Sequence, residues 1–229
     1  MAGETLKTEA VCLRIIPWSR TSHIVTWLTP TGKVSTVVKG AVRPKSAFLG
    51  QYDLNYTCEI VYYARAKGEL HALRECTPLD GRESLRTNYR ALLLAEHFRH
   101  LVHDLVPGGP DAAEWLALLE TSLSRLTEPG FRPLAELLAF ELAVLRLAGL
   151  SPEVEAESGA FILRGERSIP VTPEVARCLK NPLVVKYDQI LQDAVRVIGV
   201  FYSFHVESAP ETRRTVLQMI STNEQRTGS

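Results

Sequence analysis

The sequence predicts an α+β protein, with an N-terminal five-stranded OB-fold β-barrel followed by a C-terminal all-helical domain. In the first 80 residues, short β-branched and aromatic runs alternate with turn residues, which is typical of a small barrel. From residue 81 onward, apolar residues recur at helical spacing between breaks rich in glycine and proline. We therefore expect an OB-fold domain over residues 1–80 and a helical domain over residues 81–229.

The predicted strands are short and close together. The break PWSRTS at residues 17–22 ends the first strand, and the turn PTG at residues 30–32 joins the second to the third. Trp27 lies on the second strand, and this position predicts a place in the core. The five strands are expected over residues 8–16, 23–29, 34–40, 56–64 and 70–76.

The helical domain begins after Gly81. The segment PGGPD stops the first helix, and Asp111 is the expected N-cap of the second, which runs through Leu126. The third helix is apolar on nearly every side, which predicts the buried centre of a bundle. Residues 151–170 are expected to be rich in loops. The other helices are expected over residues 84–106, 132–148, 173–179, 188–206 and 212–220.

The composition is that of an ordinary globular protein, 45% hydrophobic and 23% charged. No apolar run approaches the roughly 18 residues of a membrane span, and MAGETLKTEA lacks the layout of a signal peptide. These features predict a cytoplasmic protein. No two cysteines form a CxxC pair, so we expect inert core thiols and neither a zinc knuckle nor a redox motif. The cysteines are Cys12, Cys58, Cys76 and Cys178.

Positive charge gathers near the N-terminus although the formal net charge of the chain is +0. Between Glu9 and Asp53 no acidic residue occurs, whereas from residue 81 onward 16 basic residues face 19 acidic ones. Such a field is suited to a polyanion; on charge alone, a solvated basic face without a partner is the alternative. The cations of the acid-free segment are Arg14, Arg20, Lys33, Lys39, Arg43 and Lys45.

Aromatic side chains lie among these cations. Trp18 and Arg20 share the first predicted loop, and Phe48 and Tyr52 flank the end of KGAVRPKSAFLG, residues 39–50. Aromatic faces that stack on bases, beside cations that contact phosphates, are what single-strand binding requires. We therefore place Trp18 with the six cations as candidate nucleic-acid contacts.

No catalytic site is predicted. The sequence lacks GxSxG, GxxxxGK[ST] and GxGxxG motifs. His97, His100 and His103 recur every three residues without an HExxH motif, which favours a polar helix face over a metal site. The alternating glutamates of EVEAE, residues 153–157, indicate solvated surface. These observations favour a binding protein over an enzyme.

Two segments resemble the RecO family of bacterial DNA repair proteins. PWSRTSHIVTWLTPTGKVSTVVKGAVRPKS, residues 17–46, is similar to the N-terminal part of that family, with its loop, glycine turn and basic strand exit. FELAVLRLAGL, residues 140–150, is similar to the family's central helix and its glycine exit. The length and the order of the two domains agree over essentially the whole chain.

The resemblance implies a non-enzymatic recombination mediator without a cofactor. Such a protein binds single- and double-stranded DNA, anneals complementary strands, pairs with RecR, contacts the C-terminal tail of single-stranded DNA-binding protein, and helps to load RecA. By position, Lys39, Arg43 and Lys45 match the family's basic motif, and Arg213 and Arg214 are further candidates for DNA contact. The localisation implied is cytoplasmic and nucleoid-associated. The alternative is an OB-fold adaptor that binds an acidic protein tail without direct nucleic-acid binding.

The chain departs from the family at one place. Many members carry a four-cysteine zinc site after the central helix, whereas Glu155 and Ser158 stand here where the first two cysteines would fall. We therefore predict no zinc and a degenerate zinc-site region at about residues 151–170.

The acidic partner tail ends in an aromatic residue, so an apolar pocket edged by arginine is expected for it. Candidate residues lie on and just before the third predicted helix, where Arg132 and Arg146 fall at a similar helical angle. The candidates are Phe131, Arg132, Phe140 and Arg146.

Overall fold

The computed structural model describes residues 3–65, 70–107, 112–155, 159–164, 167–205 and 211–227. Contacts divide the chain into two compact units. The first comprises Met1–Thr87 with Val102–Ser124, and the second comprises Asn88–Leu101 with Arg125–Ser229. The first unit thus includes a helical segment distant from the strands in sequence. The boundary expected at residues 80 and 81 stays a prediction.

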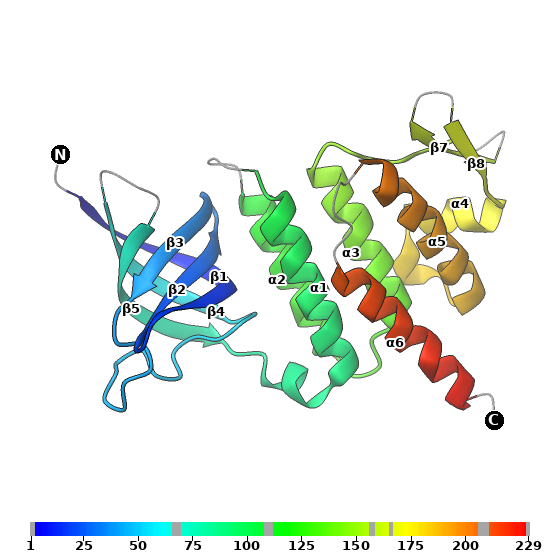
Figure 1. The fold of residues 1–229 in the computed structure, drawn as a ribbon. Coiled ribbons are helices and arrows are strands. Elements are labelled where there is room, and N and C mark those ends of the chain that lie inside the picture. Colours follow the sequence, from blue (N-terminus) through cyan, green and yellow to red (C-terminus); the bar gives the residue numbers. More distant parts are fainter. Residues whose placement is uncertain are drawn as a thin grey trace. The chain divides into compact units, whose positions relative to one another are not determined.

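The first unit is built on a five-stranded sheet of the OB type, as predicted (Figure 1). The strands pair in the order β1-β2-β3-β5-β4, and β4 pairs back to β1, so that each strand has two neighbours. Only the β3–β5 pair is parallel. The strands are β1 (Glu4–Ser19), β2 (Ser22–Thr29), β3 (Gly32–Val38), β4 (Thr57–Ala64) and β5 (Leu70–Asp80).

Strand β1 continues past the predicted break. Pro17 pairs with His23 and Ser19 pairs with Ser22, so the turn between β1 and β2 consists of only two residues. Trp18 is the extra residue of a β-bulge at this place. The expectation of a loop at residues 17–22 was wrong because a bulge lets proline stay within a strand whose ladder is locally interrupted.

The sheet encloses an apolar core centred on Trp27, as predicted. The Trp27 side chain is fully buried, and its Nε1 donates a hydrogen bond of 2.9 Å to Thr36 Oγ1. Cys12, Cys58 and Cys76 belong to the same core and form no disulfide. A hydrogen bond with Cys76 and burial raise the pKa of the Cys58 thiol, so it stays protonated.

The helices confirm the predicted helical domain, with changes at their ends. Strong apolar periodicity placed each one, whereas terminal residues depend on local capping. Asp111, the expected N-cap of α2, lies outside the described residues. The helices are η1 (Glu83–Thr87), α1 (Tyr89–Leu105), α2 (Ala113–Leu126), α3 (Pro133–Leu147), α4 (Pro173–Lys180), η2 (Pro182–Val184), α5 (Asp188–His205) and α6 (Glu211–Thr227).

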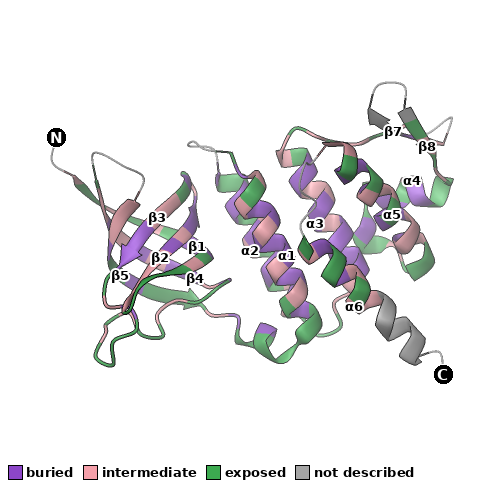
Figure 2. Cartoon of the chain, viewed as in Figure 1, coloured by how far each residue is buried: buried purple, intermediate pink, exposed green. Residues whose placement is uncertain are grey.

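Helix α3 is the buried centre of the second unit, as its apolar sequence predicted. Leu137, Leu138 and Phe140 are fully buried, and the helix is mostly purple in Figure 2. Helix α5 packs against both α3 and α4. The Phe140 ring stacks on Phe98 of α1 with the ring centroids 3.9 Å apart.

The segment expected to be rich in loops contains a small sheet, so the C-terminal region is not all-helical. Strands β6 (Glu153–Glu155), β7 (Ala160–Arg164) and β8 (Arg167–Pro170) pair in that order. Phe161 of β7 is fully buried and contacts the Phe201 ring of α5 edge-on at 5.6 Å. The strands are too short for sequence alternation to reveal, and burial of Phe161 against α5 stabilises them.

Candidate nucleic-acid interface

Two segments of the predicted basic surface lie next to each other. The backbone N–H of Val42 donates to the carbonyl of Thr21 at 3.4 Å, and the N–H of Gly40 donates to Ser22 Oγ at 3.3 Å. Gly40 has φ +69°, a conformation that glycine adopts without strain. The turn that follows Trp18 therefore lies beside the loop that follows β3, although the two are separated by a full hairpin.

The loop after β3 is ordered by its own backbone hydrogen bonds. N–H groups donate to carbonyl groups three residues earlier at Arg43, Ser46, Leu49 and Gln51, over distances of 2.9–3.3 Å. The far end is held by Tyr52, whose Oη lies 2.8 Å from His23 Nδ1 of β2. The chain is thus arranged before any ligand binds, which lowers the ordering cost of binding.

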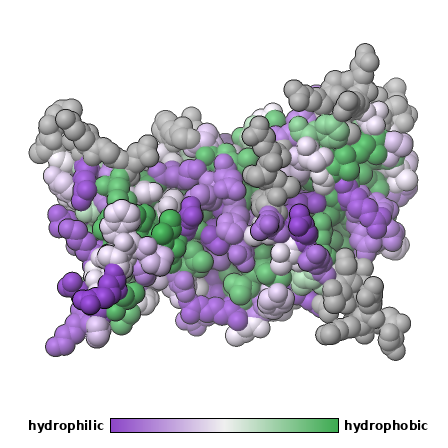
Figure 3. Space-filling model, viewed as in Figure 1, coloured by the Kyte–Doolittle hydropathy of each residue, from purple (hydrophilic) through white to green (hydrophobic). Residues whose placement is uncertain are grey.

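Five predicted contact residues are exposed cations on or beside these segments. Among the described residues none of them forms an ion pair with a carboxylate. The lower left of Figure 3, where the loop after β3 lies in Figure 1, is strongly hydrophilic with a hydrophobic area beside it. The five are Arg14, Arg20, Lys39, Arg43 and Lys45, and we call them the basic surface.

Lys33 does not belong to the basic surface. It lies at the start of β3 and Lys39 follows its end, so about 20 Å of extended strand separates them. The Lys33 ammonium donates to the carbonyl of His103 at 2.8 Å. Lys33 is therefore engaged within the first unit.

Acidic residues lie on the strands of the same sheet that are remote from the basic surface. Glu9 of β1 pairs with Glu59 of β4, and Glu75 of β5 pairs with Val61. Lys7 forms an ion pair of 2.8 Å with Glu59. The charges are thus segregated around the sheet, and repulsion by carboxylates would disfavour a polyanion along β4 and β5.

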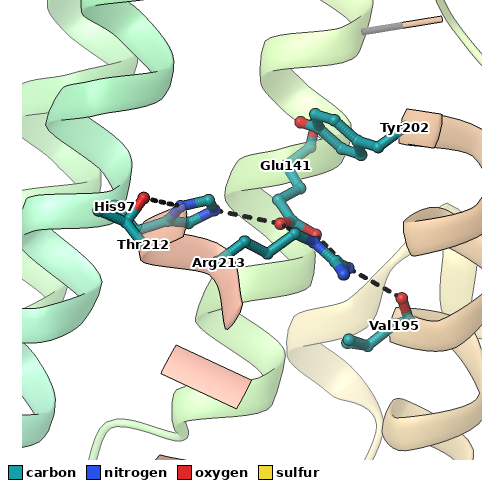
Figure 4. Close-up of polar contacts among 6 residues, drawn as sticks. All are labelled: His97, Glu141, Val195, Tyr202, Thr212 and Arg213. Carbon is teal, nitrogen blue, oxygen red and sulfur yellow. Dashed lines mark hydrogen bonds and ion pairs between the residues drawn. The ribbon is translucent and has the colours of Figure 1, made fainter. Parts of the chain in front are cut away.

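The two C-terminal candidates differ in their surroundings. Arg214 is exposed, whereas Arg213 is buried and its guanidinium binds the Glu141 carboxylate, with Nε to Oε1 at 2.7 Å and Nη2 to Oε2 at 3.2 Å (Figure 4). Nη2 of Arg213 also donates to the carbonyl of Val195 at 2.9 Å. We leave Arg213 out of the proposed interface because its donors are used inside the second unit.

His97 completes this buried network. Its Nε2 lies 3.1 Å from Glu141 Oε1, and its Nδ1 lies 3.0 Å from Thr212 Oγ1. Because a carboxylate only accepts, Nε2 carries the proton and donates to Glu141. The expectation that His97 belongs to a polar helix face was wrong, since its side chain is fully buried. The network, which sequence reasoning missed, joins α1, α3 and α6.

Glu141 gives the second unit a testable dependence on pH. Burial alone would raise its pKa, but Arg213 and His97 outweigh burial and hold the pKa below the usual 4.5. The stabilisation is therefore present above pH 4.5 and is lost as pH falls through the lowered pKa. We expect the urea midpoint of helix unfolding, followed by circular dichroism, to fall less steeply below pH 4.5 in Glu141→Gln than in the wild type. Equal pH profiles would contradict this.

The residues expected to form a tail pocket do not lie together. Phe140 is fully buried against Phe98, and so it offers no wall to an exposed ligand. Arg132 and Arg146 lie at opposite ends of α3, about 21 Å apart along its axis. Arg132 donates to the carbonyls of residues 185 and 186 and to the Asp188 carboxylate. Phe131 is half-buried.

A different groove is present in the second unit. It has a volume of about 560 Å³ and is lined by α3, α5 and α6. Val195, Val200 and Leu217 supply apolar walls, and Arg196 and Arg213 are the basic residues of the lining. We call it the α5–α6 groove.

Metal and membrane features were also compared with expectation. Among the residues that the structure describes, no group of three or more His, Cys, Asp or Glu side chains could hold a metal ion. Ser158 of the degenerate zinc-site region lies outside those residues. No helix within the described ranges combines the length and apolar character of a membrane span.

The sheet and the helical unit together define an OB-type protein with an appended helical region. The model of the recombination protein O N-terminal domain matches residues 1–82, and that of the C-terminal domain matches residues 86–160. The chain therefore belongs to the recombination protein O (RecO) family.

Several curated relatives bear the name DNA repair protein RecO. The protein from Acetivibrio thermocellus is 27% identical over 66% of this chain, and the one from Anaeromyxobacter sp. Fw109-5 is 31% identical over 67%. The protein from Roseiflexus sp. RS-1 is 29% identical over 75% of this chain. The matched regions span about 60% of the length of these relatives.

Proposed function

We propose that this chain is a non-enzymatic DNA-binding mediator of recombinational repair. The observation that carries the proposal is the basic surface on the OB-type sheet, where exposed cations lie on an ordered loop and turn without carboxylate partners among the described residues. The family of the chain, whose relatives are named DNA repair proteins, supports it.

The basic surface would hold the phosphate backbone. Lys39, Arg43 and Lys45 follow β3, and OB folds bind oligonucleotides on the face of strands 2 and 3 and on the flanking loops. Contacts of lysine and arginine with phosphates release counterions and do not depend on base sequence. Both single- and double-stranded DNA would therefore bind, and Arg14, Arg20 and the more distant Arg214 would add contacts.

Strand annealing would follow from charge neutralisation. Two DNA strands repel each other through their phosphates, and cations on the protein lower that repulsion when the strands approach. We extend the proposal to pairing with RecR and to assistance in loading RecA, as the family resemblance implies. No step requires nucleotide hydrolysis.

The same basic surface could instead recruit an acidic protein tail, as an adaptor would. The experiment that separates the two is fluorescence anisotropy with a labelled dT oligonucleotide and with an acidic peptide, each at three salt concentrations. DNA binding whose log affinity falls linearly with log salt supports the mediator. Absence of oligonucleotide binding at low salt, with the peptide bound, would replace the mediator by the adaptor.

The α5–α6 groove is the better place for the acidic tail of single-stranded DNA-binding protein. Apolar walls would receive an aromatic end, and Arg196 and Arg213 are available to attract carboxylates. The volume of about 560 Å³ lies within the usual range of ligand pockets. This location replaces the one expected around Phe131 and Arg146.

Val200→Asp is expected to weaken binding of an acidic peptide that ends in phenylalanine by at least about tenfold, because it adds a like charge to an apolar wall. Val200 is 39% exposed, so the substitution should leave the fold intact. Leu183→Asp is the matched control, since Leu183 is 42% exposed and lies outside the groove. Equal affinities of the two variants would exclude the groove as the tail site.

A further inference from the structure

Large apolar side chains are exposed within the basic surface. Trp18 is 63% exposed, Leu49 is 55% exposed and Val42 is 48% exposed. Ile16, two residues before Trp18 on β1, is 36% exposed. A purely electrostatic phosphate site gains nothing from such groups, because exposed apolar surface on a monomer is costly and marks a contact region.

The backbone positions Trp18 beside the cations. As the extra residue of the bulge in β1, Trp18 stands outside the regular ladder, and bulges re-aim side chains in this way. The hydrogen bond between Val42 and Thr21 joins the loop after β3 to the turn that begins two residues after Trp18. Apolar and basic side chains thus alternate over one region made of two adjacent segments.

An unstacked nucleobase fits this combination. A single strand presents phosphates and open base faces, whereas a duplex presents phosphates and keeps its base faces stacked. We propose that Trp18 stacks on a base of single-stranded nucleic acid, and that Val42 and Leu49 extend this contact, so that the surface prefers single strands over duplexes. The inference rests on the proposed function, since the cations must first hold the backbone.

Charge argues against a protein or a zwitterionic surface as the occupant. The segment from residue 10 to residue 52 contains six cations and no carboxylate, so the apolar groups lie in a uniformly positive field. The partner must therefore combine a regular negative charge with flat apolar groups. Single-stranded nucleic acid has both in every residue.

Tryptophan fluorescence tests the inference directly because the chain has three tryptophans, of which only Trp18 is accessible. Trp27 is 0% exposed and Trp115 is 3% exposed, so quenching by a bound base reports on Trp18. We expect a dT oligonucleotide to quench the emission of the wild type and a duplex of equal length to quench it little. Trp18→Ala should lose the quenching.

Affinity provides the second readout. We expect Trp18→Ala to weaken binding of the dT oligonucleotide by about 5- to 150-fold, the range of base–aromatic stacking, and to change duplex binding by less than about twofold. Trp18→Phe should restore most of the loss. Leu79→Ala, which removes an apolar side chain 52% exposed on β5, is the matched control and should bind as the wild type does.

The outcomes separate the inference from the proposed function. Equal losses for single strand and duplex, or unchanged quenching in the wild type, would overturn the role of Trp18. If at the same time removal of Lys39 and Arg43 abolished binding, DNA binding by the basic surface would stand. If the wild type bound neither nucleic acid at low salt, both the inference and the proposed function would be overturned.

Discussion

Replacement of Glu141 by glutamine is expected to lower the free energy of unfolding of the second unit by about 3–5 kcal/mol, the usual cost of removing one partner from a buried ion pair. Glu141 is fully buried, and the Arg213 side chain is only 10% exposed. Glutamine keeps the shape but leaves the guanidinium in a low-dielectric interior without its counter-charge. His97 also loses its carboxylate acceptor.

Two spectroscopic signals allow this loss to be assigned to one unit. All three tryptophans, Trp18, Trp27 and Trp115, lie in the first unit, whereas helix circular dichroism reports mainly on the second. With a denaturant slope of about 2 kcal/mol/M, the dichroism midpoint in urea should fall by about 1.5–2.5 M. The fluorescence midpoint should move less.

The controls for Glu141→Gln use the neighbouring arginine and the whole pair. Arg214→Ala removes an exposed cation from the same helix and should change stability by less than about 0.5 kcal/mol. The double variant Glu141→Leu with Arg213→Met should be more stable than Glu141→Gln because it leaves no buried charge unpaired. A dichroism midpoint equal to that of the wild type in Glu141→Gln would show that the pair does not hold the unit together.

The second large effect is expected for DNA. Lys39→Ala with Arg43→Ala should lower the salt dependence of dT binding by about 1.4, or about 0.7 for each lost phosphate contact on a single strand. At 0.1 M salt this corresponds to about 25-fold weaker binding. Anisotropy at three salt concentrations measures both quantities, and the loss should be similar for all sequences because phosphate contacts do not read bases.

The matched control removes the same charge elsewhere on the sheet. Lys7→Ala with Arg74→Ala also takes away two cations, but Lys7 pairs with Glu59 and Arg74 lies over the Tyr63 ring at 5.7 Å. This control should keep most of the affinity and the salt slope. If both double variants bound equally well, net charge rather than the basic surface would account for any DNA binding.

The strands and helices were predictable because their signals are local. Apolar alternation and turn residues placed five strands of the OB-type sheet, and the apolar helix around Phe140 was recognised as a bundle centre. Strand β1 was cut short at Pro17 because proline usually ends a strand, and only the pairing with His23 shows that the ladder resumes. The three strands after α3 were missed because each is too short to display a period.

The buried network was beyond sequence reasoning. His97 and Glu141 are 44 residues apart, and Glu141 and Arg213 are 72 residues apart, so no spacing rule connects them. An arginine in a polar C-terminal helix resembles Arg214 equally well, and both were candidates for DNA contact. The interior of the second unit decides between them, because only one of the two side chains points toward a buried carboxylate (Figure 4).

The sequence by itself determined the family, the order of sheet and helices, and the acid-free positive segment between Glu9 and Asp53, because these depend on composition and short-range pattern. Only the tertiary structure decided which cations remain exposed. It joined the turn after Trp18 to the loop after β3, moved Lys33 to the other end of its strand, and buried Arg213. The physical reason is that burial and pairing depend on groups brought together by long-range packing, which neither charge counts nor spacing along the chain contain.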